Sequence, residues 1–199
     1  MRTPLPTVPV TLALIGTCIL VYLLMMWNQE WVVRGLLISV YYHPALPEIR
    51  GGEVWRLITP AFLHFGLFHI VFNLLWTWEF GRLIESRQGG LMLLLLFLVC
   101  SLAANIAQYQ VDGPAFGGMS GVIYAFFGYT WTQGFANPRF GVRLNPPVIY
   151  LLLGWFVICW TGILESLFGL GVANTAHTAG LVSGLAVSLA VIVWQRLVR

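Results

Sequence analysis

Residues 117–131 read GGMSGVIYAFFGYTW, a serine flanked by glycines and followed by a run of mostly apolar and aromatic residues. Ser120 comes after a loop rich in glycine and proline and directly before this run, so we expect it in the first turn of a helix. The first backbone N–H groups of a helix have no partner within it, so those of Met119, Ser120 and Gly121 are expected to be free donors. The neighbouring glycines would let a substrate backbone come close.

This run belongs to the fourth of six apolar blocks along the chain. A helix that crosses the bilayer core needs about 20 mostly apolar residues, and the connections after the second block contain turn-forming residues. The blocks lie at about residues 8–27, 67–84, 91–108, 119–135, 148–164 and 172–197. We therefore predict an all-α membrane protein, a bundle of six transmembrane helices that forms a single domain over residues 1–199.

The composition excludes a soluble globular protein, because 59% of the 199 residues are hydrophobic and 9% are charged, against roughly 25% charged in an ordinary soluble domain. Nucleic acid is not an expected partner, since the net charge of +3 comes from arginines scattered among apolar blocks. Cys18, Cys100 and Cys159 lie in apolar stretches without a C-x-x-C spacing. We expect neither a disulfide nor a metal site, and no cofactor.

The stretch from Asn28 to about Pro60 mixes charged residues with tryptophan, leucine and tyrosine. Such an amphipathic stretch favours a long first loop that lies partly in the membrane interface. Seven of the ten arginines fall on the side that holds both termini, so the positive-inside rule predicts cytoplasmic termini and a long loop outside. The seven are Arg2, Arg82, Arg87, Arg139, Arg143, Arg196 and Arg199.

Polar residues inside apolar blocks are costly in a membrane, which makes them candidates for function. Ser120 is one, and His177, which shares a helix face with Gly180 and Gly184, is another. Small residues on that face would admit another helix and could bring the Ser120 hydroxyl to the imidazole, the usual base for activating a serine. Taken singly, Ser120 can instead be a packing residue and His177 a buried histidine bonded to a carbonyl group.

His69 and Asn73 are four residues apart and share a helix face. Both can donate hydrogen bonds to an oxyanion, or they can form a polar clamp between helices worth about 1 kcal/mol. Tyr124, one turn after Ser120, can hold the imidazole ring by stacking or simply pack in the bundle. No acidic residue lies near His177 in the sequence, so we predict a Ser-His dyad rather than a triad.

Two other kinds of intramembrane protease are excluded by the residues present. An aspartyl protease needs two aspartates that share a proton, and Asp112 is the only aspartate in the chain. A zinc protease is expected to carry H-E-x-x-H, whereas His64 and His69 are five residues apart with no acid between them.

These residues together resemble the rhomboid family of intramembrane serine proteases, in its compact bacterial form, over nearly the whole chain. The motifs are Trp55-Arg56 in the long loop, HFGLFH at 64–69 running into Asn73, GMSG at 118–121 with Tyr124, and Ala176-His177 with Gly180 and Gly184. In this order on six spans they are highly specific.

The resemblance implies a role for each site residue. Ser120 would be the nucleophile and His177 the general base. The oxyanion would be bound by His69, Asn73 and the backbone N–H of Ser120, with Tyr124, Gly118 and Gly121 in supporting positions. Phe72 and Trp155 would line a lateral route by which substrates enter.

The predicted function is therefore an intramembrane serine endopeptidase that cuts transmembrane protein substrates in the lipid bilayer, without a metal or cofactor. The predicted location is the bacterial cell inner membrane, with a water-filled cavity above Ser120 that opens to the periplasm. The first alternative is a non-catalytic relative that binds membrane clients without cutting them. The second, a small channel or transporter, is weakened by the lack of a visible internal repeat.

Overall fold

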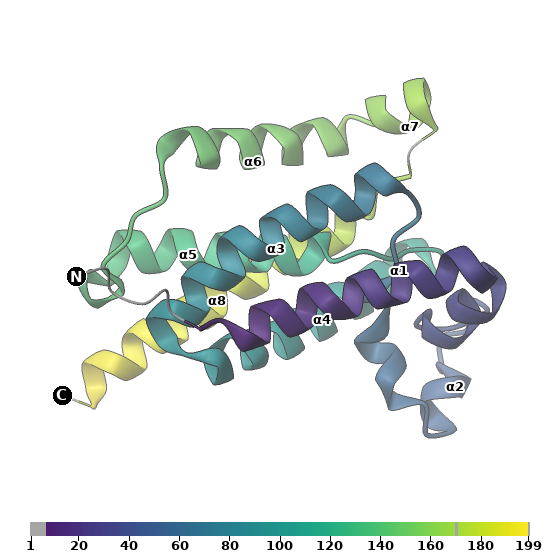
Figure 1. Cartoon of the computed structure of the whole chain (residues 1–199), viewed down its shortest axis with the longest axis horizontal. Coiled ribbons are helices and arrows are strands. Elements are labelled where there is room, and N and C mark those ends of the chain that lie inside the picture. Colours follow the sequence, from purple (N-terminus) through teal and green to yellow (C-terminus); the bar gives the residue numbers. More distant parts are fainter. Residues whose placement is uncertain (1–6, 170, 199) are drawn as a thin grey trace.

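The computed structural model describes residues 7–169 and 171–198, and every regular element within these ranges is a helix (Figure 1). The long helices are α1 (Pro9–Leu36), α3 (Leu67–Gln88), α4 (Gly90–Asp112), α5 (Ser120–Ala136), α6 (Pro146–Trp160) and α8 (Asn174–Leu197). The short ones are α2 (Pro47–Arg50), η1 (Val54–Leu57), η2 (Thr59–Phe62), η3 (Pro138–Phe140) and α7 (Ile163–Phe168). Each long helix overlaps one predicted apolar block, and the all-α prediction is confirmed.

Length and composition alone make α1, α4 and α8 candidate membrane spans. Helix α3 carries several charged residues, and α5 and α6 have only 17 and 15 residues. The crossing of the membrane by all six helices therefore stays a prediction. The orientation does too, and Arg2 and Arg199, on which it partly depends, lie outside the described residues.

Four helices end four or more residues away from the ends of their predicted blocks: α1, α3 and α4 run past them and α6 stops short. Helix α1 continues to Leu36, well past the end of the first apolar block, with a break at Asn28 (φ −150°, ψ 87°). The Asn28 side chain accepts a hydrogen bond from the Trp31 N–H at 3.1 Å and so caps a second helical segment. Helix α6 stops at Trp160, because Gly162 takes a left-handed conformation (φ 73°) and α7 follows as a separate turn.

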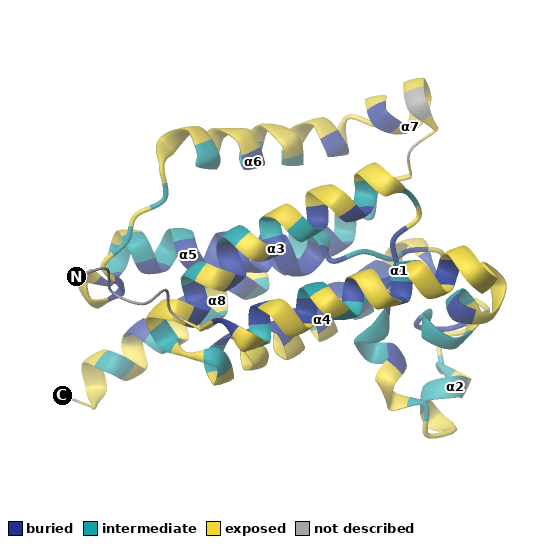
Figure 2. Cartoon of the chain, viewed as in Figure 1, coloured by how far each residue is buried: buried dark blue, intermediate teal, exposed yellow. Residues whose placement is uncertain are grey.

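Helix α5 lies at the centre of the bundle, and residues 121–130 are all buried (Figure 2). Helix α8 packs against it at a distance that only glycine allows. A Cβ at Gly180 would collide with the carbonyl group of Gly121, and one at Gly184 with the carbonyl group of Ala125. The prediction that this glycine face admits a neighbouring helix is confirmed, and the neighbour is α5.

The predicted long loop contains α2, η1 and η2 and is attached to the end of α1 by side chains. The buried Arg56 donates to the carbonyl oxygens of Arg34 at 2.7 Å and Leu37 at 2.8 Å. The Thr59 hydroxyl donates to the carbonyl oxygen of Leu36 at 2.7 Å. These carbonyls lie at the C-terminal end of α1, where the helix itself supplies no donors. The loop therefore starts from a defined position beside the bundle.

Candidate active site

Ser120 and His177 lie next to each other, at the N-terminal ends of the two helices that pack most closely. Ser120 is the first residue of α5, as predicted, and His177 lies in the first turn of α8. The Ser120 Oγ is 2.8 Å from the His177 Nε2, which is hydrogen-bond distance. Ser120 is half-buried and His177 is buried. The serine thus stays partly accessible, whereas the imidazole is enclosed by protein.

Tyr124 connects the histidine to α6. Its ring centroid is 4.8 Å from that of His177, with the two ring planes tilted by 39°. Its hydroxyl donates a 3.0 Å hydrogen bond to the carbonyl oxygen of Leu152 in α6, and its ring also packs edge-on against Phe156. A rotation of the imidazole away from Ser120 would therefore have to displace a ring that is anchored at its far end.

The His69 side chain points at the glycine segment that precedes Ser120. A Cβ at Gly118 would lie 2.6 Å from His69 Nε2 and 3.8 Å from Ser120 Oγ. Gly118 also has a φ of +125°, a conformation that favours glycine. The other ring nitrogen, Nδ1, accepts a long hydrogen bond from the Phe65 N–H at 3.4 Å. That contact favours the tautomer in which Nε2 carries the proton and faces Gly118.

Asn73 is buried one turn further along α3. Its Nδ2 donates to the carbonyl oxygen of His69 at 2.7 Å. A side-chain amide has two N–H groups, so this contact leaves one of them for a ligand. The Asn73 Oδ1 is buried and has no hydrogen-bond partner among the described residues.

One of the backbone N–H groups predicted to be free, that of Met119, already has a hydrogen-bond acceptor. The Met119 N–H donates to Nε2 of the buried His64 at 3.4 Å, while His64 Nδ1 lies 3.0 Å from the carbonyl oxygen of Phe62. The expectation that the Met119 amide is free was therefore wrong, because a neighbouring side chain satisfies it. In the described part of the chain, the N–H groups of Ser120 and Gly121 have no such partner.

Sequence reasoning missed two polar residues at the end of α4 that hold the start of α8. The side chain of Gln108 accepts a hydrogen bond from the Ala176 N–H at 2.9 Å and donates one to Asp112 at 2.8 Å. The same Asp112 oxygen accepts from the Thr175 hydroxyl at 3.0 Å. The spacing of four residues places Gln108 and Asp112 on one face of α4, but nothing in the sequence indicates that α8 lies against that face.

The two residues expected at a lateral entrance lie on different helices, and both are exposed. Phe72 in α3 has 60% of its surface exposed, and Trp155 in α6 has 48%. Helix α6 buries few of its residues, with Leu152 and Cys159 as the buried ones. It therefore packs on the bundle more loosely than α8 does.

Comparison with known proteins identifies the family of this chain. The Rhomboid domain profile matches residues 51–194, which include the serine, both site histidines and Asn73. The chain is 38% identical over 183 residues to the rhomboid protease GlpG of Enterobacter sp. (strain 638), covering 92% of this chain and 63% of that protein.

Two further curated relatives are similar. Over 180 residues the identity is 38% to the rhomboid protease GlpG of Klebsiella pneumoniae (strain ATCC 700721 / MGH 78578) and 39% to that of Salmonella choleraesuis (strain SC-B67). In both cases the match covers 90% of this chain and 62% of the relative. The chain thus spans less than two thirds of the length of these relatives. Because the domain match covers most of the chain and contains the Ser120–His177 contact, the chain belongs to the rhomboid family.

Proposed function

We propose that this chain is a serine endopeptidase that cleaves peptide bonds in or near the transmembrane segments of other membrane proteins. The observation that carries the proposal is the 2.8 Å contact between Ser120 Oγ and His177 Nε2. A serine and a histidine at this distance form the pair needed for nucleophilic catalysis. The curated relatives are named rhomboid protease GlpG, which supports the same activity.

In the first half of the reaction, His177 Nε2 takes the hydroxyl proton as Ser120 Oγ attacks the carbonyl carbon of the peptide bond. The tetrahedral intermediate collapses when the C–N bond breaks and the imidazolium gives its proton to the leaving amine. The product is an ester on Ser120. In the second half, water attacks the ester, His177 takes a proton from the water, and that proton returns to Ser120 Oγ as the acid product leaves.

His177 works without a carboxylate partner in this proposal. Its Nδ1 is buried and has no hydrogen-bond partner among the described residues, so the imidazolium is not stabilised by the third member of a triad. The Tyr124 ring, whose centroid lies 4.8 Å from that of His177, supports the imidazole in two ways instead. It holds the imidazole plane in place, and its π-face attracts the positive charge that forms during the reaction.

The oxyanion of the intermediate needs donors fixed before the reaction begins. The N–H of Ser120, Nε2–H of His69 and the second N–H of Asn73 are the donors that we assign to it. The close approach of His69 to Gly118 supports this assignment, because Gly118 leads directly into the turn that carries the nucleophile. Gly118 and Gly121 keep this wall of the site free of side chains.

The membrane arrangement belongs to the same proposal. Six helices would span a bacterial inner membrane with both termini in the cytoplasm, and Ser120 would lie in a cavity open to the periplasm. Hydrolysis requires water, and irregular backbone such as residues 113–119 is tolerated at membrane depth only beside protein or water. A substrate helix would pass Phe72 and Trp155 and unwind locally, because an intact helix hides its carbonyl groups in hydrogen bonds.

The test is cleavage of a single-span reporter protein reconstituted with the purified chain in liposomes. Ser120→Ala and His177→Ala are each expected to abolish cleavage, because each removes one partner of the proton transfer. A fluorophosphonate probe is expected to label the wild type at Ser120 and to leave both variants unlabelled. Ser183→Ala, a change at another serine of the bundle whose hydroxyl donates to the Gly180 carbonyl in its own helix, is the matched control.

The outcomes separate the proposal from its alternatives. Retained cleavage in Ser120→Ala, or labelling at a different serine, would contradict the assignment of the nucleophile. A wild type that binds the reporter but never cuts it would indicate the non-catalytic relative. Solute flux that survives Ser120→Ala, in the absence of cleavage, would indicate a channel or transporter.

A further inference from the structure

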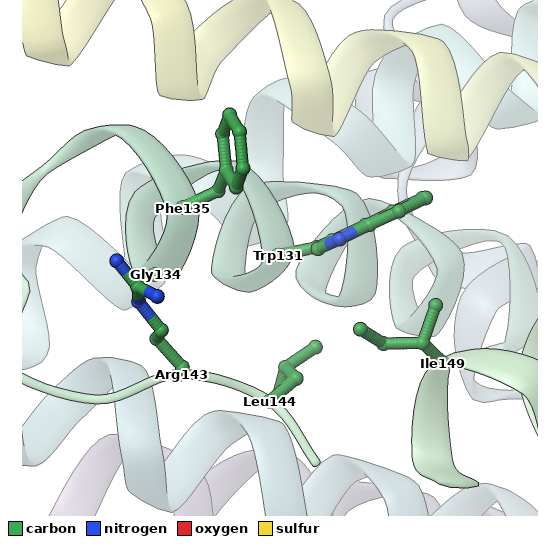
Figure 3. A pocket seen from close by; sticks show the side chains of 6 residues that line it. All are labelled: Trp131, Gly134, Phe135, Arg143, Leu144 and Ile149. Atoms are coloured by element: carbon green, nitrogen blue, oxygen red, sulfur yellow. The ribbon is translucent and has the colours of Figure 1, made fainter. Parts of the chain in front are cut away.

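A pocket lies at the C-terminal end of α5, the end far from Ser120. It has a volume of about 300 Å³ between the last turn of α5 and the connection to α6, and it is lined by Gly134, Phe135, Asn137, Gly141 and Arg143 among others. A smaller hollow of about 100 Å³ adjoins it and continues toward Trp131, Leu144 and Ile149 (Figure 3). We call the two together the α5–α6 pocket. Trp131, the lining residue nearest to Ser120 along α5, is eleven residues from it, so the pocket begins about 17 Å from the serine.

The loop that forms this pocket is held by the structure around it. A Cβ at Gly134 would lie 2.6 Å from the carbonyl oxygen of Val142, so the loop passes directly over α5 where the side chain is missing. Asn137 donates to the side chains of Gln133 at 2.7 Å and Gln195 at 3.0 Å, which ties the start of the loop to α5 and α8. The pocket is therefore a built feature of the bundle.

One side of the pocket is cationic. Arg143 lines both hollows, and Arg87 Nη1 lies 3.3 Å from where a Cβ of Gly141 would be. Ion pairs found among residues 7–169 and 171–198 involve Arg34, Arg56 and Arg82, and neither Arg87 nor Arg143 takes part in one. The pocket thus presents positive charge that no carboxylate of the described chain neutralises.

The backbone of the loop adds donors to this charge. The hydrogen bonds within the described ranges include none donated by the N–H groups of residues 141–145. Consecutive backbone N–H groups with no internal partner are typical of concave anion sites. Residues 141–144 line the pocket, so an anion bound there would lie close to the Arg143 guanidinium and to these amides, with Arg87 beside Gly141.

The other side of the pocket is apolar. In Figure 3 Trp131 and Ile149 lie on the far side of the pocket from Arg143, with Leu144 between Arg143 and Ile149. Phe135, which also lines the pocket, has 81% of its surface exposed. A small free anion would use only the arginine side. A ligand that carries both an anion and hydrocarbon would use the whole surface.

We propose that the α5–α6 pocket binds the headgroup of an anionic glycerophospholipid. The phosphate diester lies against Arg143, Arg87 and the loop amides, and the upper part of the acyl chains lies along Trp131, Ile149 and Phe135. Basic pockets at the ends of membrane helices recognise lipid headgroups in this way. The binding site is separate from the proposed catalytic site, so its test requires no proteolysis.

The experiment is a titration of the delipidated protein, in a neutral detergent, with phosphatidylglycerol and separately with phosphatidylcholine of the same acyl chains. Native mass spectrometry counts the lipids retained by each protein. Wild type is expected to retain phosphatidylglycerol in preference to phosphatidylcholine. Arg143→Gln and Arg87→Gln are each expected to weaken phosphatidylglycerol retention about fivefold, the effect of removing one arginine close to an anionic lipid.

Arg82→Gln is the matched control, because Arg82 lies on α3 near the same end of the bundle but is paired with Glu79 at 3.0 Å. It is expected to retain phosphatidylglycerol as wild type does. An equal loss of phosphatidylglycerol retention in Arg82→Gln would overturn the proposal. It would show that the lipid is attracted by the overall positive charge at this end of the bundle and not by the pocket. Complete displacement of the lipid by a large excess of inorganic phosphate would also overturn it, because the site would then be one for free anions.

Discussion

Each histidine of the site region contacts a different kind of partner, and those partners distinguish their tasks. His177 meets the Ser120 hydroxyl, His69 faces Gly118, and His64 holds the Met119 amide. In a bundle with so few polar groups, each ring nitrogen that finds a partner restricts its ring to one orientation. The three histidines therefore have different tasks, and the partner of each ring distinguishes them.

The assignment of Asn73 as an oxyanion donor predicts the effect of removing a single side chain. Asn73→Ala is expected to lower kcat for the membrane-embedded reporter about tenfold without abolishing turnover, because His69 and the Ser120 N–H still stabilise the oxyanion. KM should change little, since the interaction develops in the transition state. The measurement is reporter cleavage in liposomes over a range of substrate densities.

Leu75→Ala, on an exposed position of the same helix α3, is the control for a general effect on the helix. An unchanged kcat in Asn73→Ala would reduce Asn73 to a packing residue. A change confined to KM would indicate that Asn73 binds the substrate and does not stabilise the oxyanion.

At the scale of elements, the first turn of α8 is positioned by α4 rather than by its own sequence. Gln108 and Asp112 accept from the Ala176 N–H and the Thr175 hydroxyl, directly before His177. The carboxylate also lies at the N-terminal end of α8, where the helix dipole favours negative charge. The imidazole is therefore positioned from two sides, by Tyr124 in α5 and by this pair in α4.

Asp112→Ala is accordingly expected to slow both reporter cleavage and fluorophosphonate labelling of Ser120, by about three- to tenfold. The physical reason is the loss of two hydrogen bonds, each worth about 1 kcal/mol, that restrict the start of α8. Asp112→Asn keeps an acceptor oxygen and is expected to restore most of the labelling rate.

The control for this prediction is Gln110→Ala, an exposed change on the same turn of α4. If Asp112→Ala lowers the unfolding temperature but labels at the wild-type rate, Asp112 is structural and does not position the site. That labelling rate is the readout which a purely structural role would leave unchanged.

At the scale of the whole molecule, buried polar contacts join the long loop to the helix bundle. His64 is fully enclosed between the carbonyl group of Phe62 and the amide of Met119. Burial, with a further contribution from the nearby His69, lowers the pKa of His64 to about 4, against an opposite effect of the bond to Phe62. The folded protein therefore holds this histidine neutral.

The consequence is a loss of stability in acid. Between pH 6.5, the ordinary pKa, and about 4, the unfolded chain binds a proton at His64 that the folded chain does not. The free energy of unfolding should therefore fall as the pH drops through this window, by up to about 3 kcal/mol from this residue. Thermal unfolding in mild detergent at a series of pH values measures it.

The difference in the free energy of unfolding between wild type and His64→Gln isolates the contribution of His64, because glutamine does not titrate. That difference should shrink as the pH falls from 6.5 to 4. His43→Gln, a change at an exposed histidine of the long loop, is expected to parallel wild type. Parallel curves for wild type and His64→Gln would contradict the prediction.

The sequence by itself determined the all-α class, the position of each long helix and the residues from which a site could be built. Apolar blocks are contiguous in the chain and polar residues inside them are costly, so both are readable locally. Ser120 at the start of a helix follows in the same way from the glycines before it and the apolar run after it.

Only the tertiary structure decided which of these elements meet. The Ser120–His177 contact joins residues 57 positions apart and depends on glycines that let α5 and α8 touch. The use of the Met119 amide by His64, the support from Gln108 and Asp112, and the pocket beside Arg143 likewise depend on how separate segments pack. Local propensity and hydropathy carry no information on such contacts, because each one is set by the shape of a distant partner.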